Sequence, residues 1–228
     1  ILVLGVITVA LFVLTLIFPK INIIIGIGIL FLLAAFLLRK NVKNVVIALL
    51  FGVIASGVVY GVDFFVNDVL QPHQQNRIKV LVNPDADPLG AGWNVTQSKI
   101  AIGSGGAYGK GFLKGTQTKF DFVPEQSTDF IFCTIGEEHG FLGSSIVVIL
   151  FVVFLSRIVF LAERQKTTFS RVYAYSVASI LFFHFAINIG MTIGLAPVVG
   201  IPLPFFSYGG SSLWSFTILL FILLKLDA

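Results

Sequence analysis

Charged residues are scarce in this 228-residue chain: Asp, Glu, Lys and Arg make up 11% of it, whereas 57% is hydrophobic. Soluble domains carry about 25% charged residues, so this composition excludes an ordinary soluble enzyme, a disordered chain and a coiled coil. A single Cys excludes a disulfide framework and a thiolate metal cluster. The net charge of +4 is too small and too scattered for nucleic-acid binding. The 24 Phe and 22 Gly favour an all-α, polytopic transmembrane helix bundle.

Several apolar runs are long enough to cross a membrane, which takes about 20 mostly apolar residues. They cover residues 1–18, 21–38, 42–66, 129–160, 172–195 and 207–226, which predicts six spans. The fourth run is overlong, so we expect it to tilt or to extend beyond the membrane. The chain opens inside an apolar run without an initiator Met, and we expect further sequence before it. The predicted domains are helices over 1–66, a polar loop over 67–128, and helices over 129–228 with a Pro/Gly-rich outer loop at 193–210.

Positive charge in the short segments lies almost entirely on one side of the membrane. That side carries Arg39, Lys40, Lys43, Arg157, Arg164, Lys166, Arg171 and Lys225. The short segments of the other side carry only Lys20. Because Lys and Arg accumulate on the cytoplasmic side, we expect both chain ends there. The loops at 67–128 and 193–210 are then predicted to lie on the outer face.

The 67–128 loop is much longer than an ordinary connection, and such loops are commonly functional. Residues 93–102 predict a short amphipathic helix, and we expect the loop to be ordered and packed on the bundle. Its cations are Arg77, Lys79, Lys99, Lys110, Lys114 and Lys119. Either the loop is solvated and its cations are balanced by nearby carboxylates, or it binds an anionic ligand such as a lipid phosphate. The Gly-rich segment at 103–111 does not match a P-loop, because position 104 is Ser and position 111 is Gly.

Asp129 follows Ser127 and Thr128 directly before an apolar run. One interpretation is an N-cap of the fourth predicted helix, worth about 1 kcal/mol. The other is a carboxylate at the outer mouth of the bundle, able to take a proton from a substrate hydroxyl. A helix N-terminus would lower the pKa of this carboxyl and keep it ionised near neutral pH. The sequence leaves both interpretations open.

Polar side chains interrupt two of the apolar runs. They are Glu137, Glu138, His184 and Asn188. Carboxylates inside a membrane usually face a bundle interior or a cavity. His184 and Asn188 share one helix face through their i, i+4 spacing, and we expect them to hydrogen-bond the Glu pair. A structural polar network is the favoured interpretation and a proton path is the alternative. No cluster has metal-ligand spacing.

Three blocks in chain order carry a family resemblance. They are HQQNRI at 73–78 with Pro84 and Asp87-Pro88, DFVPEQSTDFIFCTIGEEHGFLG at 121–143, and GLAPVVGIPLPFFSYGGSS at 194–212 with His184, Asn188, Gly190 and Met191 before it. Together they resemble the hallmark of the SEDS proteins (RodA, FtsW and SpoVE). The run Gly115-Thr116-Gln117 is most similar to RodA. The resemblance covers about residues 45–226 firmly and the first two spans by position.

The resemblance implies about ten spans, of which this chain holds six. It also implies a peptidoglycan glycosyltransferase that polymerises lipid II on the outer face of the bacterial inner membrane, in cell elongation, cell shape control or cell division. The family's essential carboxylate falls on Asp129, which would be the general base. Arg77 and Lys110 would offset the charge of the diphosphate. The further substrate-binding residues it suggests are Lys114, Gln117 and Glu125.

The implied partners are lipid II, the nascent glycan strand, membrane lipids and a class B penicillin-binding protein, which is a transpeptidase. No resident cofactor is implied, although a divalent cation (Mg²⁺ or Mn²⁺) could share the charge of the diphosphate. A lipid II flippase is one alternative function, supported weakly by the Pro and Gly residues that interrupt the last two spans. A non-catalytic scaffold of the cell-wall synthesis complex is another.

Overall fold

The computed structural model describes residues 14–15, 18–38, 42–83, 87, 90–120 and 122–227, and these contain helices, turns and loops but no strand. The chain forms two compact units, Ile1–Asn83 and Pro84–Ala228, and each is described by itself. The prediction of an all-α fold is confirmed. The first predicted span, at 1–18, lies almost wholly outside the described residues.

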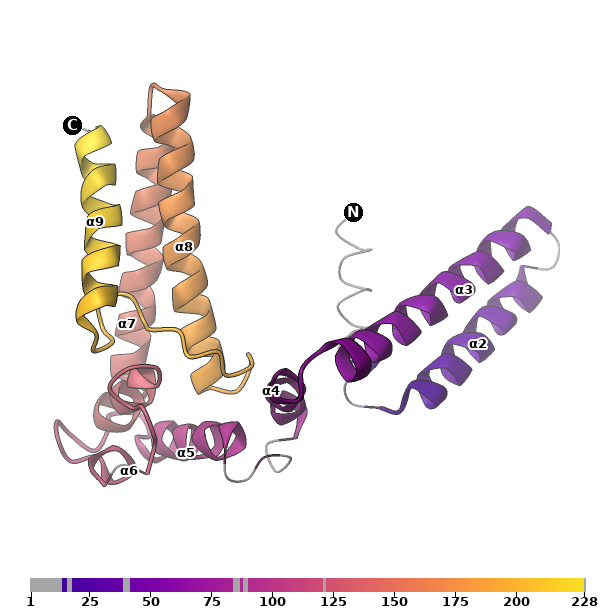
Figure 1. The fold of residues 1–228 in the computed structure, drawn as a ribbon, viewed down its shortest axis with the longest axis horizontal. Helices are drawn as coiled ribbons and strands as arrows, with labels where there is room; N and C mark the ends of the chain where they lie inside the picture. Colours follow the sequence, from indigo (N-terminus) through magenta and orange to yellow (C-terminus); the bar gives the residue numbers. More distant parts are fainter. Residues whose placement is uncertain are drawn as a thin grey trace. The chain divides into compact units, whose positions relative to one another are not determined.

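In the first unit, helices α2 (Lys20–Leu37) and α3 (Val42–Phe64) lie side by side (Figure 1). Gly52 lets them approach, since a Cβ there would lie 3.0 Å from Cβ of Phe31. Lys20 forms an ion pair with Asp63 at 2.6 Å. The helix α3 then continues into a short π-helix, η1 (Phe65–Val69), and α4 (Pro72–Val82) follows.

The second unit begins with α5 (Ala91–Ser104) and the single-turn α6 (Thr116–Lys119). Three long helices follow: α7 (Ile131–Arg164), α8 (Thr168–Thr192) and α9 (Gly210–Asp227). The helix α8 packs against both α7 and α9 (Figure 1), around a core of Ile158, Ala162, Ala174, Val177, Leu181, Phe216 and Leu223. Asp227 joins the end of α9 to the end of α7, because it pairs with Arg164 at 2.5 Å and accepts a hydrogen bond from Gln165 at 2.7 Å.

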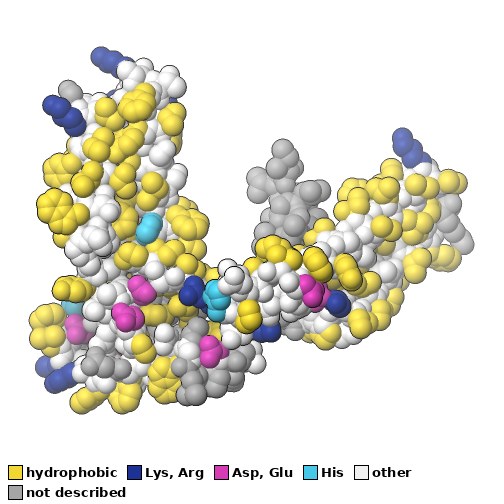
Figure 2. All heavy atoms as spheres, in the orientation of Figure 1, with side chains coloured by type: hydrophobic (Ala, Val, Ile, Leu, Met, Phe, Trp, Pro, Cys, Tyr) yellow, Lys and Arg dark blue, Asp and Glu magenta, His cyan; other side chains and the backbone are white. Residues whose placement is uncertain are grey.

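Five helices in the described part of the chain are long and apolar enough to span a membrane: α2, α3 with η1, α7, α8 and α9. Their outward side chains are mostly large and apolar, and Figure 2 shows hydrophobic side chains covering them. Such a surface is stable in lipid and not in water. The chain is therefore a multi-pass membrane protein, and the five predicted spans after residue 20 are confirmed.

The loop predicted at 67–128 is divided between the two units. Its first part belongs to the first unit, because Gln75 Nε2 on α4 donates to the carbonyls of Asn67 and Leu70, both at 2.9 Å. Its second part packs on the long helices, since α5 contacts α7 and α8 and Ser98 Oγ donates to the Thr192 carbonyl at 2.9 Å. A helix over the predicted residues 93–102 is confirmed within α5, although Trp93 and Ile100 are exposed. The boundary between the two units therefore falls inside the predicted loop, between Asn83 and Pro84, and the assignment of 67–128 to one functional loop stays a prediction.

Candidate functional site

A break in α7 explains why its apolar run is overlong. Gly140 has φ 63° and ψ −160°, which no α-helical residue adopts, so residues 131–139 form a separate short helical segment. A break leaves carbonyls before it and amides after it without helical partners. The Gly-rich loop supplies them: the amides of Lys110 and Gly111 donate to the carbonyls of Glu137 and Glu138 at 3.0 and 2.9 Å. In return, the amides of 141 and 142 donate to the carbonyls of 106 and 107 at 2.9 and 3.1 Å.

Glycine is required on both sides of this contact. A Cβ at Gly105 would lie 2.0 Å from the carbonyl oxygen of Gly136, and one at Gly109 would lie 2.1 Å from that of Glu138. A Cβ at Gly140 would lie 2.3 Å from the amide nitrogen of Gly109. No side chain fits at such distances, so two backbones meet directly here. The Gly-rich segment thus closes the helix break.

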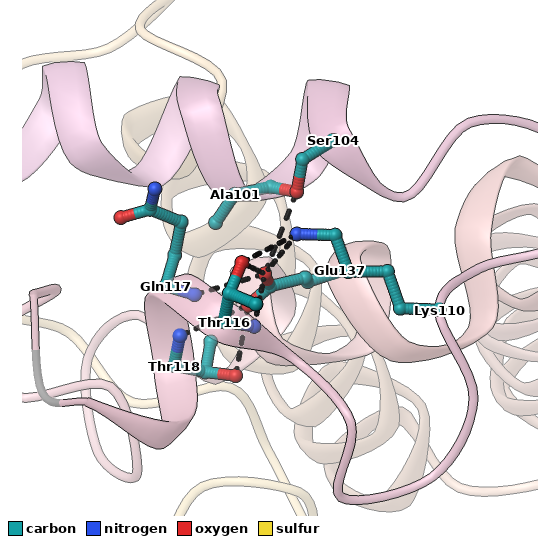
Figure 3. Close-up of polar contacts among 7 residues, drawn as sticks. All are labelled: Ala101, Ser104, Lys110, Thr116, Gln117, Thr118 and Glu137. Atoms are coloured by element: carbon teal, nitrogen blue, oxygen red, sulfur yellow. Dashed lines mark hydrogen bonds and ion pairs between the residues drawn. The ribbon is translucent and has the colours of Figure 1, made fainter.

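Glu137 lies at the centre of this contact, with a side chain that is 0% exposed. Figure 3 shows its carboxylate surrounded by donors. Lys110 Nζ pairs with Oε1 at 2.7 Å, and the amides of Thr116, Gln117 and Thr118 donate at 2.8, 2.9 and 2.9 Å. Thr118 Oγ1 adds a bond of 2.9 Å. Because α6 begins at Thr116, these amides are the free N–H groups of its first turn. Glu137 therefore holds the 110–118 segment in place.

The predicted network of four polar side chains is two separate sets, and its prediction as one network is wrong. Glu138 is also buried and accepts a hydrogen bond from the amide of Leu113 at 3.1 Å. His184 instead lies 3.4 Å from the carbonyl of Pro202. Asn188 donates to two other carbonyls, those of Asp129 and Ile201. The break at Gly140 is the reason, because it turns the segment that carries both Glu residues toward the Gly-rich loop.

Asp129 lies on a compact turn that precedes α7. The amides of Thr128 and Phe130 both donate to the carbonyl of Glu125, at 3.2 and 3.1 Å. Phe130 is buried in a core with Ala101 of α5, and the other members are Val123, Cys133 and, partly buried, Ile102 and Val198. The N-cap of α7 is Phe130, with no side-chain cap bond. The interpretation of Asp129 as an N-cap is therefore wrong.

Donors from α8 and from the outer loop between α8 and α9 hydrogen-bond to main-chain carbonyls of this turn. Asn188 Nδ2 donates to the Asp129 carbonyl at 2.8 Å and to the Ile201 carbonyl at 2.7 Å. Ser207 Oγ donates to the Thr128 carbonyl at 2.6 Å, and the amide of Tyr208 donates to the Ser127 carbonyl at 2.8 Å. Three consecutive carbonyls of the turn are thus bound by donors from another part of the chain.

The carboxylate of Asp129 is half-buried and faces Gly200, at which a Cβ would lie 3.0 Å from Oδ2. Among the described residues, no hydrogen bond reaches this carboxylate. Burial raises the pKa of Asp129, and the negative charge of Glu125 raises it further. The predicted lowering by a helix N-terminus is wrong, because the carboxyl group does not cap α7. A carboxylate with unused lone pairs and a raised pKa is suited to accept a proton.

The predicted substrate-binding residues fall in different places. Lys110 is paired with Glu137, and the backbone N–H of Gln117 donates to the same carboxylate. Glu125 lies on the Asp129 turn, where Thr128 Oγ1 donates to its Oε2 at 2.9 Å. Lys114 is exposed. Arg77 is exposed on α4 of the first unit, and its role stays a prediction.

Two cations beside the turn were not singled out by the sequence. Lys119 lines a cavity of about 460 Å³ together with Gln126 and Ser127, next to Thr118 and Glu138. Lys99 lies against the outer loop, since a Cβ at Gly194 would lie 2.4 Å from its Nζ. Both were counted among the loop cations, but linear spacing carries no signal of these tertiary contacts. Within the described residues, neither forms an ion pair.

A resident metal site does not fit the side chains that the structure describes. Within that part of the chain, no group of three or more His, Cys, Asp or Glu residues is placed to hold an ion. The participation of Mg²⁺ or Mn²⁺ therefore stays a prediction.

Comparison with known proteins places these features in a family. A family model described as "Cell cycle protein" (FtsW, RodA and SpoVE) matches residues 1–228. The chain is 44% identical over 169 residues to the peptidoglycan glycosyltransferase RodA of Treponema pallidum, covering 74% of this chain and 39% of the relative. It is 49% identical over 145 residues to the peptidoglycan glycosyltransferase MrdB of Escherichia coli strain K12, covering 64% and 39%.

A solved structure is also similar to this chain. It is a chain of a peptidoglycan synthase complex, described for its coordination of polymerization and crosslinking. The TM-score is 0.56 at 29% identity, and the match covers 88% of this chain and 54% of that one. The chain thus spans well under half the length of the curated relatives it matches. The family model covers the whole sequence, and the chain belongs to the FtsW/RodA/SpoVE family of SEDS proteins.

Proposed function

We propose that this chain carries the catalytic carboxylate of a RodA-type peptidoglycan glycosyltransferase, which polymerises lipid II into glycan strands during cell elongation. The observation that carries the proposal is the state of Asp129. The backbone of its turn is held by hydrogen bonds from Asn188, Ser207 and Tyr208. No described residue, however, donates a hydrogen bond to the carboxylate of Asp129. A fixed carboxylate with free lone pairs is what a general base requires. Relatives named peptidoglycan glycosyltransferase support the reaction.

In the proposed reaction, Asp129 takes the proton of the attacking sugar hydroxyl. The hydroxyl oxygen forms a bond to the anomeric carbon of the lipid-linked donor, and the bond from that carbon to the diphosphate breaks. The diphosphate leaves on its lipid with the bonding electron pair, so negative charge grows on it. Lys99 and Lys119 are exposed cations beside the turn and the outer loop. We expect them to offset this charge, in place of Lys110.

A flippase is less well supported, because it needs a polar path through the membrane. The buried carboxylate that could provide one, Glu137, has its oxygens bound by Lys110 and the 116–118 amides. The free carboxylate lies on a turn outside α7. A scaffold would need no such carboxylate at all. Both alternatives predict that Asp129 can be replaced without loss of polymerisation by the complex.

The orientation and partners follow from charge and from similarity. The excess of Lys and Arg on one side of the spans supports a cytoplasmic location for that side, and thus an outward-facing Asp129 turn in the bacterial inner membrane. The solved relative belongs to a peptidoglycan synthase complex that polymerises and crosslinks. We therefore propose a class B penicillin-binding protein as partner, with lipid II and the growing strand as substrates.

The deciding experiment measures lipid II polymerisation by the purified protein, reconstituted in nanodiscs with its transpeptidase partner. Asp129→Asn keeps the size of the side chain but cannot take the proton, so the rate should fall about 10²–10⁴-fold. Glu163→Gln removes a carboxylate near the far end of α7 and is the matched control, expected to polymerise at the wild-type rate. Both should bind the partner and unfold at the wild-type temperature. Wild-type polymerisation by Asp129→Asn would reject the proposal.

A further inference from the structure

Asn188 is a fully buried amide on α8 that contacts the Asp129 turn across the second unit. Its Nδ2 group carries two hydrogens, and the structure uses both: one reaches the Asp129 carbonyl at 2.8 Å and the other the Ile201 carbonyl at 2.7 Å. These two carbonyls belong to segments more than 70 residues apart in the sequence. A single side chain therefore joins the turn, the outer loop and α8.

The outer loop meets the carboxylate one residue before Ile201. Gly200 has φ 73°, and a Cβ there would lie 3.0 Å from Asp129 Oδ2. Asn188 thus fixes the backbone that carries the carboxylate and the backbone that the carboxylate faces. Its position on α8 is itself rigid, because residues around it pack against α7 in a core that includes Phe151, Phe185, Leu203 and Ile189.

We propose that Asn188 is a positioning residue, which sets the place of the Asp129 carboxylate against the outer loop for proton transfer from the substrate. The proposal rests on the proposed function of Asp129. Misplacing a reacting group by about 1 Å can reduce the rate about 10²-fold, and binding of the substrate elsewhere is unaffected. Loss of Asn188 should therefore lower kcat and leave KM nearly unchanged.

Asn188→Ser tests this, because a Ser hydroxyl is shorter and carries one hydrogen for two carbonyls. The kcat for lipid II should fall on the order of 10²-fold with KM close to that of the wild type. The control is Thr192→Val, one turn further along the same helix. Thr192 is also fully buried, but its hydroxyl bonds only within α8, to the Ile189 carbonyl at 2.8 Å. It should keep the wild-type kcat.

A second measurement does not depend on activity. The native Cys133 is fully buried, so a thiol introduced by Asp129→Cys can be alkylated selectively by a water-soluble maleimide. Adding Asn188→Ser should accelerate this alkylation severalfold, because the turn is released. It should leave the alkylation of an exposed thiol from Lys114→Cys unchanged.

The outcomes separate the two proposals. Wild-type kcat in Asn188→Ser, or unchanged alkylation at position 129, overturns the positioning role. Equal acceleration at positions 129 and 114 also overturns it, because general unfolding would then be the cause. If Asp129→Asn keeps full activity, the proposed function fails, and the alkylation result still decides whether Asn188 fixes the turn.

Discussion

Two carboxylates eight residues apart in the sequence, Asp129 and Glu137, have opposite environments. Glu137 is fully buried and bound by an ammonium group, three amides and the hydroxyls of Ser104, Thr116 and Thr118. Asp129 is half-buried, and no hydrogen bond from a described residue reaches its carboxylate, although its main chain is firmly held. A carboxylate whose lone pairs are all used stabilises structure, whereas one with free lone pairs can accept a proton.

The comparison shows that the more deeply buried carboxylate is not the one that is free to react. Glu137 is the more deeply buried of the two, and a buried charge in an apolar run is a common sign of a functional site. Its partners, however, come from the 104–118 segment that it holds, and they leave it no free oxygen. Asp129 is marked by the reverse pattern, in which the protein binds the backbone and leaves the side chain unpaired.

The largest effect on stability should follow from Glu137→Ala. This change leaves the Lys110 ammonium and the amides of 116–118 without their acceptor. Removing one partner of a buried ion pair costs about 3–5 kcal/mol, and the partial exposure of Lys110 at 27% places the expected loss near the lower end. Thermal unfolding in detergent and proteolysis of the 105–118 segment would measure it.

Asp129→Asn is the matched comparison for this variant, since it should lose activity and keep wild-type stability. If Glu137→Ala unfolds at the same temperature as Asp129→Asn, the structural role of Glu137 is refuted. If Glu137→Ala folds normally and loses only activity, Glu137 belongs to the reaction and the distinction between the two carboxylates fails.

The sequence predicted much of this architecture but not the contact at its centre. Apolar runs are a local signal, and those behind α2, α3, α7, α8 and α9 gave their helices within a few residues. Gly140 lies in such a run and carries no local mark of a break. The break is stable because the Gly-rich loop, some 30 residues earlier, bonds to both sides of it. Such long-range pairing cannot be read from spacing.

The same limit applies to the site. The family resemblance identified Asp129, but its local pattern suggested an N-cap, and the structure shows a turn held by Asn188 and Ser207. The resemblance implied that Lys110 offsets the charge of the diphosphate. Its partner, Glu137, was assigned to a membrane network because it lies in an apolar run. The structure pairs these two residues with each other, which neither segment predicts by itself.

A smaller effect is expected from Lys110→Met, which keeps most of the side-chain volume and removes the charge. The carboxylate of Glu137 keeps its amide donors, so the loss of stability should be about 1–3 kcal/mol, as for one hydrogen bond to a charged group. The KM for lipid II should be unchanged, because the ammonium group of Lys110 is already paired with Glu137. Lys114→Met, an exposed cation in the same segment, is the stability control. A raised KM with normal stability in Lys110→Met would restore Lys110 as a substrate ligand.

The smallest effect concerns the charge beside the free carboxylate. As the proposed general base, Asp129 must be ionised to act, and its pKa is raised first by burial and then by the charge of Glu125. The rate should therefore be lost, as pH falls, at a higher pH than an ordinary Asp would give. Glu125→Gln removes the like charge and lowers the pKa of Asp129, so the acid limb of kcat should move to lower pH. Burial still raises the pKa of Asp129 in this variant, so the rate should still be lost at a higher pH than an ordinary Asp would give.

The Gln side chain can still accept the bond from Thr128 Oγ1, so the turn is kept and the rate near neutral pH should change little. Glu163→Gln, which removes a charge far along α7, should leave the limb in place. A limb that moves to higher pH, or a raised KM with an unmoved limb, would show that Glu125 acts on substrate. In that case the expected effect of the Glu125 charge on the pKa of Asp129 would be refuted, and the role of Asp129 would rest on the Asp129→Asn measurement.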